Sequence, residues 1–137
     1  MKIVGFNFTK INIEKISDNL KNLKINTNID ITDVKEVKSE IFKNKEVLME
    51  IKFNYSISYE PKIAKILFSG NLMALMDEKK AKQFLKEWKK KGLPEENKVF
   101  LFNMILRKSN IKAVELEDEL NLPLHISFPT IQGIRKE

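Results

Sequence analysis

A strict alternation of apolar and polar residues runs along the middle of the chain. Large apolar side chains occupy every second position, at Val47, Met49, Ile51, Phe53, Tyr55, Ile57 and Tyr59. A period of two places them all on one face of a β-strand. The residues between them include Glu50, Lys52, Asn54, Ser56 and Ser58. We therefore predict a long central strand in an antiparallel sheet that is covered on one face only.

A first strand is predicted from Lys2 to Ile13. Its apolar residues begin in one phase at Val4, Phe6 and Phe8 and continue in the other phase from Ile11. A change of phase inside an extended segment indicates a β-bulge.

Two segments separate this strand from the central one. Ser17 to Asn28 is polar and rich in asparagine, which favours local turns, and we predict a crossover loop with apolar anchors. Ile29 to Phe42 has extended character, with Val34 out of phase with the apolar residues Ile29, Ile31, Val37 and Ile41. Lys43 to Lys45 is a short polar break that suits a hairpin before the central strand.

A fourth strand is predicted from Ile63 to Met76. It follows Glu60-Pro61-Lys62, where the proline suits the second position of a tight turn. Gly70 is expected to mark a kink or the end of strand pairing.

After Asp77 the hydrophobic period changes from two to about 3.6, which predicts helices. Asp77 is suited to an N-cap, and Gly92 is expected to end a first helix whose apolar face carries Ala81, Phe84, Leu85 and Trp88. A second, long helix is predicted from Pro94 to about Leu120. The apolar segment that follows contains two prolines and cannot continue the helix. The predicted fold is α+β: a four-stranded antiparallel sheet with a short and a long helix on one face.

Composition narrows the classes of function. The chain has 137 residues, no cysteine, one histidine and a formal net charge of +6. A single domain spanning residues 1–137 is expected. The absence of cysteine excludes disulfides and thiol chemistry. No apolar run is long enough for a membrane span or a signal core, so we expect a soluble, cytoplasmic protein.

The sequence offers little for catalysis. It contains no glycine-rich phosphate loop and no nucleophile elbow. Acidic residues cluster near the end of the long helix and are interpreted as a solvated face rather than cation ligands, at Glu115, Glu117, Asp118 and Glu119. His125 is interpreted as a packed or surface histidine. We predict a binding protein without enzymatic activity, cofactor or metal.

The first helix is basic. Lysines occur at positions 79, 80, 82, 86, 89, 90 and 91, and Trp88 lies among them. A small nucleic-acid-binding domain is therefore the alternative function. Interleaved Asp77, Glu78 and Glu87 favour instead an amphipathic helix whose lysines extend into solvent. Salt dependence would distinguish this alternative from a protein that binds its partner through apolar contacts. Phosphate binding weakens steeply with added salt, whereas apolar contacts change little.

The long helix is apolar on more sides than one sheet can cover. Val99 to Phe102 are consecutive apolar residues, and large apolar patches are rare on monomers. We predict self-association, with a second copy contacting Phe6, Phe8, Val99, Phe100, Phe102, Met104 and Leu106.

The order of the elements and two local strings resemble the SecB family of protein-export chaperones. Phe8-Thr9-Lys10-Ile11-Asn12-Ile13-Glu14 is similar to the first-strand segment of the family, in which aromatic-Thr-Lys precedes an alternating run. Leu120-Asn121-Leu122-Pro123-Leu124-His125-Ile126 is similar to the Leu-Asn-Leu-Ala-Pro segment after the long helix. The resemblance extends over nearly the whole chain and includes Gly70.

The resemblance implies an ATP-independent chaperone that holds unfolded or precursor polypeptides, for protein export or for a toxin–antitoxin pair. It implies a homotetramer built as a dimer of dimers, with a dimer as the second choice. It also implies an apolar groove lined by the crossover loop, the second strand and the tail. The groove residues are then Ile16, Leu20, Leu23, Ile25, Ile29, Ile31, Leu122, Leu124, Ile126 and Phe128. Known members tend to be acidic, whereas this chain is basic and Glu50 is the single acid among the polar positions of its central strand.

Overall fold

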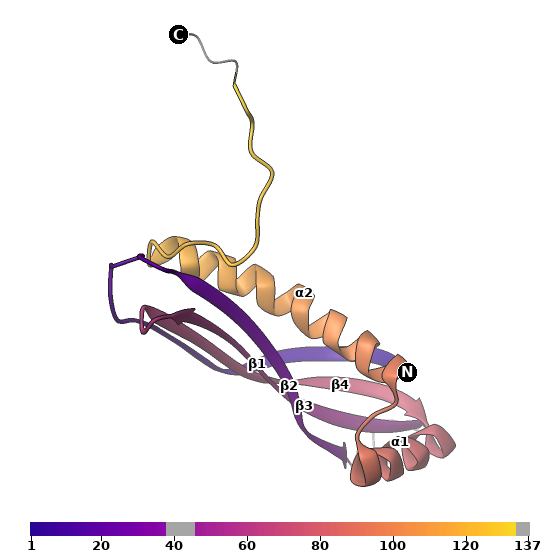
Figure 1. The fold of residues 1–137 in the computed structure, drawn as a ribbon. Coiled ribbons are helices and arrows are strands. Elements are labelled where there is room, and N and C mark those ends of the chain that lie inside the picture. The colour runs from indigo at the N-terminus through magenta and orange to yellow at the C-terminus, as the bar shows by residue number, and fades with distance from the viewer. Residues whose placement is uncertain (38–45, 134–137) are drawn as a thin grey trace.

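The computed structural model describes residues 1–37 and 46–133. Four long strands are followed by two helices and an extended tail (Figure 1). The predicted hairpin at residues 43–45 and the predicted end of the second strand at residues 38–42 lie outside the described residues. The elements are β1 (Lys2–Lys15), β2 (Lys24–Val37), β3 (Glu46–Glu60), β4 (Ala64–Asp77), α1 (Glu78–Lys91) and α2 (Glu95–Glu119).

The strands form one antiparallel sheet in the order β1-β4-β3-β2. β3 lies inside the sheet, and its apolar positions from Met49 to Tyr59 are exposed by 1% or less. The opposite positions, such as Lys52 and Asn54, are exposed. The predicted central strand with one covered face is therefore confirmed, as is the α+β class.

β1 contains two bulges rather than the one that was predicted. The expected irregularity lies between Phe8 and Lys10, and a second one lies between Ile3 and Gly5. Ile3 pairs with Ala74 and packs against the core, whereas Val4 falls within the second bulge and is 46% exposed. The prediction that Val4 shares a face with Phe6 was therefore wrong, because one extra residue reverses the alternation.

β2 begins earlier than predicted. Lys24 to Asn28 were assigned to the crossover loop, but Ile25 and Thr27 pair with Tyr59 and Ile57 of β3. The low β-propensity of asparagine is overridden here because Asn26 and Asn28 point to the polar outward face.

A bulge also explains the irregular phase of β2. The register shifts between Ile31 and Asp33, which brings Val34 onto the core face, where it is 5% exposed. Val37 consequently pairs with Leu48 in the outward phase. Its predicted common face with Ile31 was wrong.

Gly70 lies in the middle of β4 and does not end the pairing. It is flanked by Phe8 on one side and Phe53 on the other. A Cβ atom at this position would lie 2.3 Å from the backbone oxygen of Asn7 and 2.7 Å from Cζ of Phe53. The glycine is required because the Phe53 ring packs directly over the β4 backbone.

The two helices agree with their predicted bounds. Asp77 is the N-cap residue of α1, and Gly92 follows the helix with a φ of 84°, a value that favours glycine. Ala81 and Phe84 of α1 are buried.

α2 crosses the inward face of the sheet (Figure 1). Its buried residues are spaced by four, at Leu101, Ile105, Ser109, Ala113 and Glu117. Because a helix turn has 3.6 residues, this stripe winds gradually around α2 and follows the twist of the sheet. The small residues Ser109 and Ala113 leave room between α2 and the large rings of β3.

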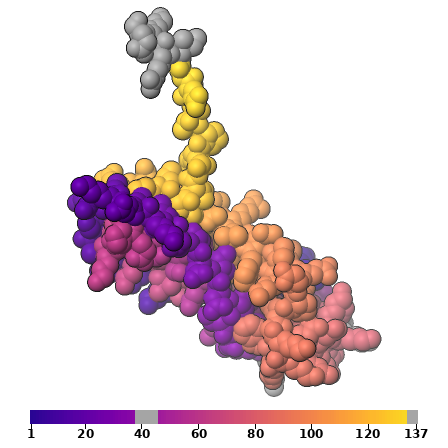
Figure 2. All heavy atoms as spheres, in the orientation of Figure 1, coloured from indigo at the N-terminus to yellow at the C-terminus, as the bar shows by residue number. Residues whose placement is uncertain are grey.

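Beyond α2 the chain reverses, runs back along the helix and then leaves the domain as an extended tail (Figures 1 and 2). The N–H of Leu122 donates to the carbonyl of Glu117 at 2.8 Å, and that of Asn121 to the carbonyl of Asp118 at 3.3 Å. Asn121 has a φ of 54°. This is the Schellman arrangement of a helix end, with asparagine in the left-handed position.

Candidate functional site

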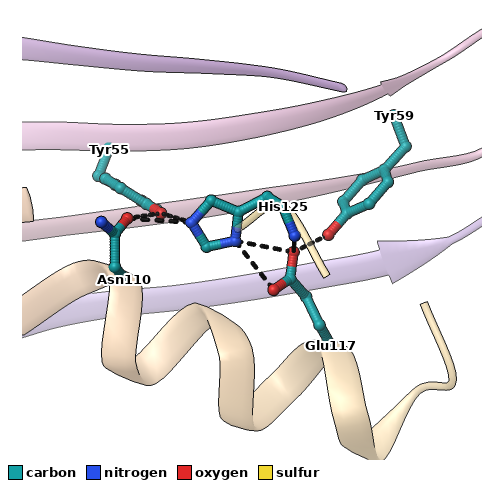
Figure 3. Close-up of polar contacts among 5 residues, drawn as sticks. All are labelled: Tyr55, Tyr59, Asn110, Glu117 and His125. Atoms are coloured by element: carbon teal, nitrogen blue, oxygen red, sulfur yellow. Dashed lines mark hydrogen bonds and ion pairs between the residues drawn. The ribbon is translucent and has the colours of Figure 1, made fainter. Parts of the chain in front are cut away.

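The reversal at Asn121 brings the tail onto the buried carboxylate of Glu117. This side chain closes the sheet-facing stripe of α2 and is fully buried. The Tyr59 hydroxyl donates to it from β3, and the backbone N–H of His125 donates to its Oε2 at 3.1 Å. Nδ1 of His125 lies 2.9 Å from Oε1. A buried carboxylate needs such donors, and Glu117 has three of them (Figure 3).

The other side of the His125 ring is equally enclosed. Its Nε2 lies 3.0 Å from Oδ1 of Asn110 and 3.1 Å from the Tyr55 hydroxyl. The Tyr55 hydroxyl donates to the same Asn110 oxygen at 2.8 Å. We call these five residues the polar clasp: Tyr55, Tyr59, Asn110, Glu117 and His125 (Figure 3).

Burial and charge keep both tyrosines in the clasp protonated. Burial raises the pKa of the Tyr55 phenol above its ordinary value, and the nearby Glu117 carboxylate raises it further. Burial also raises the pKa of Tyr59, as do its hydrogen bond to Glu117 and the charge of that carboxylate. Each phenol therefore serves as a hydrogen-bond donor throughout the physiological pH range.

The clasp is structural. The side chains of His125 and Glu117 are 3% and 0% exposed, so no substrate reaches them. Over residues 1–37 and 46–133, no group of three His, Cys, Asp or Glu residues is arranged to hold a metal ion. The clasp ties the tail to α2 and β3. The interpretation of His125 as a packed histidine is confirmed, and the solvated interpretation of Glu117 was wrong.

His125 is held inward, which leaves its neighbours outside. Leu122 is buried at 5% exposure, whereas Leu124 and Ile126 are each 37% exposed and Phe128 is 53% exposed. The clasp thus fixes the point at which apolar side chains of the tail turn toward solvent.

The crossover loop lies at the same end of the molecule as the end of α2. The ammonium group of Lys15 donates to the carbonyl of Leu120 at 3.1 Å, and the N–H groups of Ile16 and Ser17 donate to the carbonyl of Ile63. Two predicted groove residues between β1 and β2, Ile16 and Leu20, are 55% and 47% exposed.

The remaining predicted groove residues are less accessible. Leu23, Ile25 and Ile29 are half-buried and pack against the core. Ile31 is 7% exposed and lines a hollow of about 160 Å³ beside Trp88, Leu93 and Phe102. The segment between β1 and β2 therefore lies next to the start of β2, whereas Ile31 lies further along the strand next to the start of α2.

The predicted self-association residues form two groups. On α2, Val99 and Phe100 are 49% and 43% exposed, and Phe102, Met104 and Leu106 are half-buried. On β1, the rings of Phe6 and Phe8 pack against Phe53 and Phe68, respectively, with centroids 5.2 Å apart in both pairs. Ile111 of α2 is 66% exposed and was not assigned to this surface from the sequence.

The aromatic residues do not form an open stacking surface on the central strand. Phe53, Tyr55 and Tyr59 are buried, as predicted, and Phe84 of α1 is 4% exposed. Trp88 is half-buried against the core. No helix in the described part of the chain is long and apolar enough to cross a membrane.

Comparison with known proteins gives a likeness of fold alone. No protein-family model and no curated protein matches the sequence. Among solved structures, the SecB-like chaperone Rv1957 of Mycobacterium tuberculosis, in complex with a ChAD peptide from the HigA1 antitoxin Rv1956, is similar to this chain. The two share 10% sequence identity and a TM-score of 0.55 over 97% of this chain and 92% of that one. The fold of this chain is therefore SecB-like.

Proposed function

We propose that this chain is an ATP-independent chaperone that binds non-native polypeptides through exposed apolar side chains. The observation that carries the proposal is a SecB-like fold in which the segment between β1 and β2 exposes Ile16 and Leu20 and the tail exposes Phe128. The similar solved structure contains a bound peptide, which supports a polypeptide as the class of ligand.

The energetics suit a sequence-tolerant binder. Burial of apolar surface contributes about 25 cal/mol per Å² and has no directional requirement. A client that covers several half-exposed side chains gains a few kcal/mol at each binding region before entropic costs. Several weak regions along an extended client would then add by avidity, without nucleotide hydrolysis.

Self-association forms part of the proposal. We infer that the apolar face of α2 around Val99 and Phe100 packs against another copy, since about half of each side chain is exposed on the isolated chain. A tetramer would cover this face and place several client-binding regions on one particle.

The outward face of the sheet does not favour docking of a basic partner. Glu50 of β3 already contacts Lys35, at 3.4 Å, and Asn71, at 3.0 Å. Charges of both signs are interleaved across this face. The lysines that point outward are Lys2, Lys10, Lys24, Lys35, Lys52 and Lys65. The acidic residues that point to the same side are Glu14, Asp30, Asp33, Glu46, Glu50, Glu60 and Asp77. Interleaved charges largely cancel and do not produce the acidic field that attracts a basic partner. The proposal therefore concerns the holding of clients and does not include a step of protein export.

Suppression of aggregation tests the proposal. A chemically denatured protein is diluted into buffer with the purified chain, without nucleotide, and light scattering is followed at low and high salt. We expect a dose-dependent loss of scattering that changes little with salt, because the contacts are apolar. Unchanged scattering at a molar excess of the chain would contradict a holding function.

A further inference from the structure

The charge of the molecule is concentrated on one short helix. α1 contains seven lysines and two glutamates, a net charge of +5, whereas the whole chain carries +6. The other 123 residues therefore sum to +1. Charge that is spread over a surface mainly serves solubility, but a field confined to 14 residues marks a candidate docking surface.

Four of the seven lysines of α1 lie in one row along the helix, which we call the lysine comb. Lys79, Lys82, Lys86 and Lys90 recur at intervals of three and four residues, on the side opposite the buried Ala81 and Phe84. With a rise of 1.5 Å per residue, they extend over about 16 Å of helix surface. All four are exposed.

A shallow hollow runs beside this comb. The four lysines line it together with Lys91, with Leu93 and Pro94 of the connection between the helices, and with one carboxylate, that of Glu87. Over the described residues, the one ion pair of these four lysines joins Lys82 to Glu78 at 3.6 Å, with both side chains more than half exposed. Such a pair is worth little and is readily exchanged for a partner's carboxylate.

The partner class follows from the type of side chain. The face has no arginine for bidentate contact with base edges or phosphates, and Trp88 of α1 packs toward the core and offers no stacking platform. Lysine ammonium groups spaced by one helical turn match carboxylates with the same spacing on another helix. The apolar lining from Leu93 and Pro94 fits aliphatic side chains between those carboxylates.

We propose that the lysine comb of α1 and its adjoining hollow bind an acidic polypeptide segment, in which Asp or Glu recurs every three or four residues. This surface includes none of the exposed loop and tail side chains Ile16, Leu20 and Phe128, and it does not depend on the proposed chaperone function. Its occupant is recognised by charge, so its binding falls with added salt, unlike that of an apolar client.

The test uses a labelled helical peptide with glutamate at every third or fourth position, and a permuted peptide of the same composition. Fluorescence anisotropy is measured at low and at near-physiological salt. The triple variant K82Q/K86Q/K90Q removes three charges from the comb. The control variant K65Q/K80Q/K89Q removes three charges that do not line the hollow, one on β4 and two on α1. We expect the comb variant to weaken binding about tenfold and the control variant about twofold or less, because separated surface charges act weakly.

Three outcomes would overturn the inference. Equal weakening in the two triple variants would mean that net charge alone attracts the peptide. Equal affinity for the permuted peptide would show that the spacing of the carboxylates is not recognised. The comb would instead be a phosphate-binding surface if a short DNA duplex or phosphatidylserine vesicles bound more tightly than the acidic peptide and this binding depended on the same three lysines. Aggregation suppression by the comb variant, measured in parallel, reports separately on the chaperone proposal and is expected to be unchanged.

Discussion

The Glu117 carboxylate accepts hydrogen bonds from both the backbone N–H and the ring of His125, although the side chains of both residues are almost fully buried. Eight positions separate these residues, and the chain reversal at Asn121 lies between them. The interaction turns a buried charge at the end of α2 into the anchor of the tail. It also determines which tail residues face solvent.

The first prediction concerns this anchor. Replacing Glu117 with Ala leaves three buried donors without an acceptor, from Tyr59 and from the backbone and ring of His125. We expect the free energy of unfolding to fall by about 3 kcal/mol or more. Limited proteolysis should also cut the tail faster. Chemical denaturation and timed digestion measure the two effects.

Glu115→Ala is the matched control, because this carboxylate is 57% exposed and pairs with Lys112 on the same helix. Its cost should stay within about 0.5 kcal/mol. A comparable fall in stability for the two variants would show that Glu117 has no special role in holding the tail.

The two tyrosines of the clasp are the only tyrosines in the chain, so an alkaline titration reports on them alone. Both phenols have a pKa raised in the folded state, by burial first and then by Glu117. A raised folded pKa contributes stability below the unfolded value of about 10, and this stability is lost as pH rises above it. We expect phenolate absorbance to appear together with unfolding. Full ionisation while far-ultraviolet circular dichroism remains native would contradict a buried clasp.

A third prediction concerns Gly70. Gly70→Ala places a methyl group within 2.7 Å of the Phe53 ring and closer still to the backbone of Asn7. Displacement of β1 or of that ring should cost about 1–3 kcal/mol or more. Gly133→Ala is the control, because no atom lies within 4 Å of a Cβ built there. Equal thermal midpoints for the two variants would refute the close approach.

Some of the architecture could be predicted from the sequence because local periodicity and burial agree. β3 alternates without interruption, and Asp77 and Gly92 bracket α1 in the sequence as they do in the structure. The strand bulges were harder to place. The orientations of Val4 and Val34 each follow from one extra residue, whose position depends on pairing with a neighbouring strand.

The clasp could not be predicted from local pattern. Glu117 sits among Glu115, Asp118 and Glu119 and looks solvated until its spacing from Leu101 is followed in steps of four. A second signal was available, since buried tyrosines such as Tyr55 and Tyr59 require hydrogen-bond partners for their hydroxyl groups. The partner on the tail depends on the chain reversal at Asn121, which brings together residues from different elements.

Self-association provides the fourth prediction. Sedimentation at micromolar concentration should show a species heavier than the 16.0 kDa chain, because Val99 and Phe100 would otherwise remain half exposed. Replacing both with Ser should shift the assembly toward the monomer without unfolding it. A wild-type monomer under these conditions would contradict the prediction.

The central claim is that apolar side chains of the loop and tail hold non-native polypeptides. The most direct measurement is the affinity for a labelled, permanently unfolded polypeptide, compared between two double variants with matched exposure. Leu20 and Phe128, at 47% and 53%, are replaced with Ser in one, and Val4 and Ile11, at 46% and 45%, in the other. We predict about thirtyfold weaker binding for the L20S/F128S variant and about twofold or less for V4S/I11S, since truncating each apolar side chain that touches the client costs about 1 kcal/mol. Equal affinities for the two variants would contradict a client-binding site at the loop and tail.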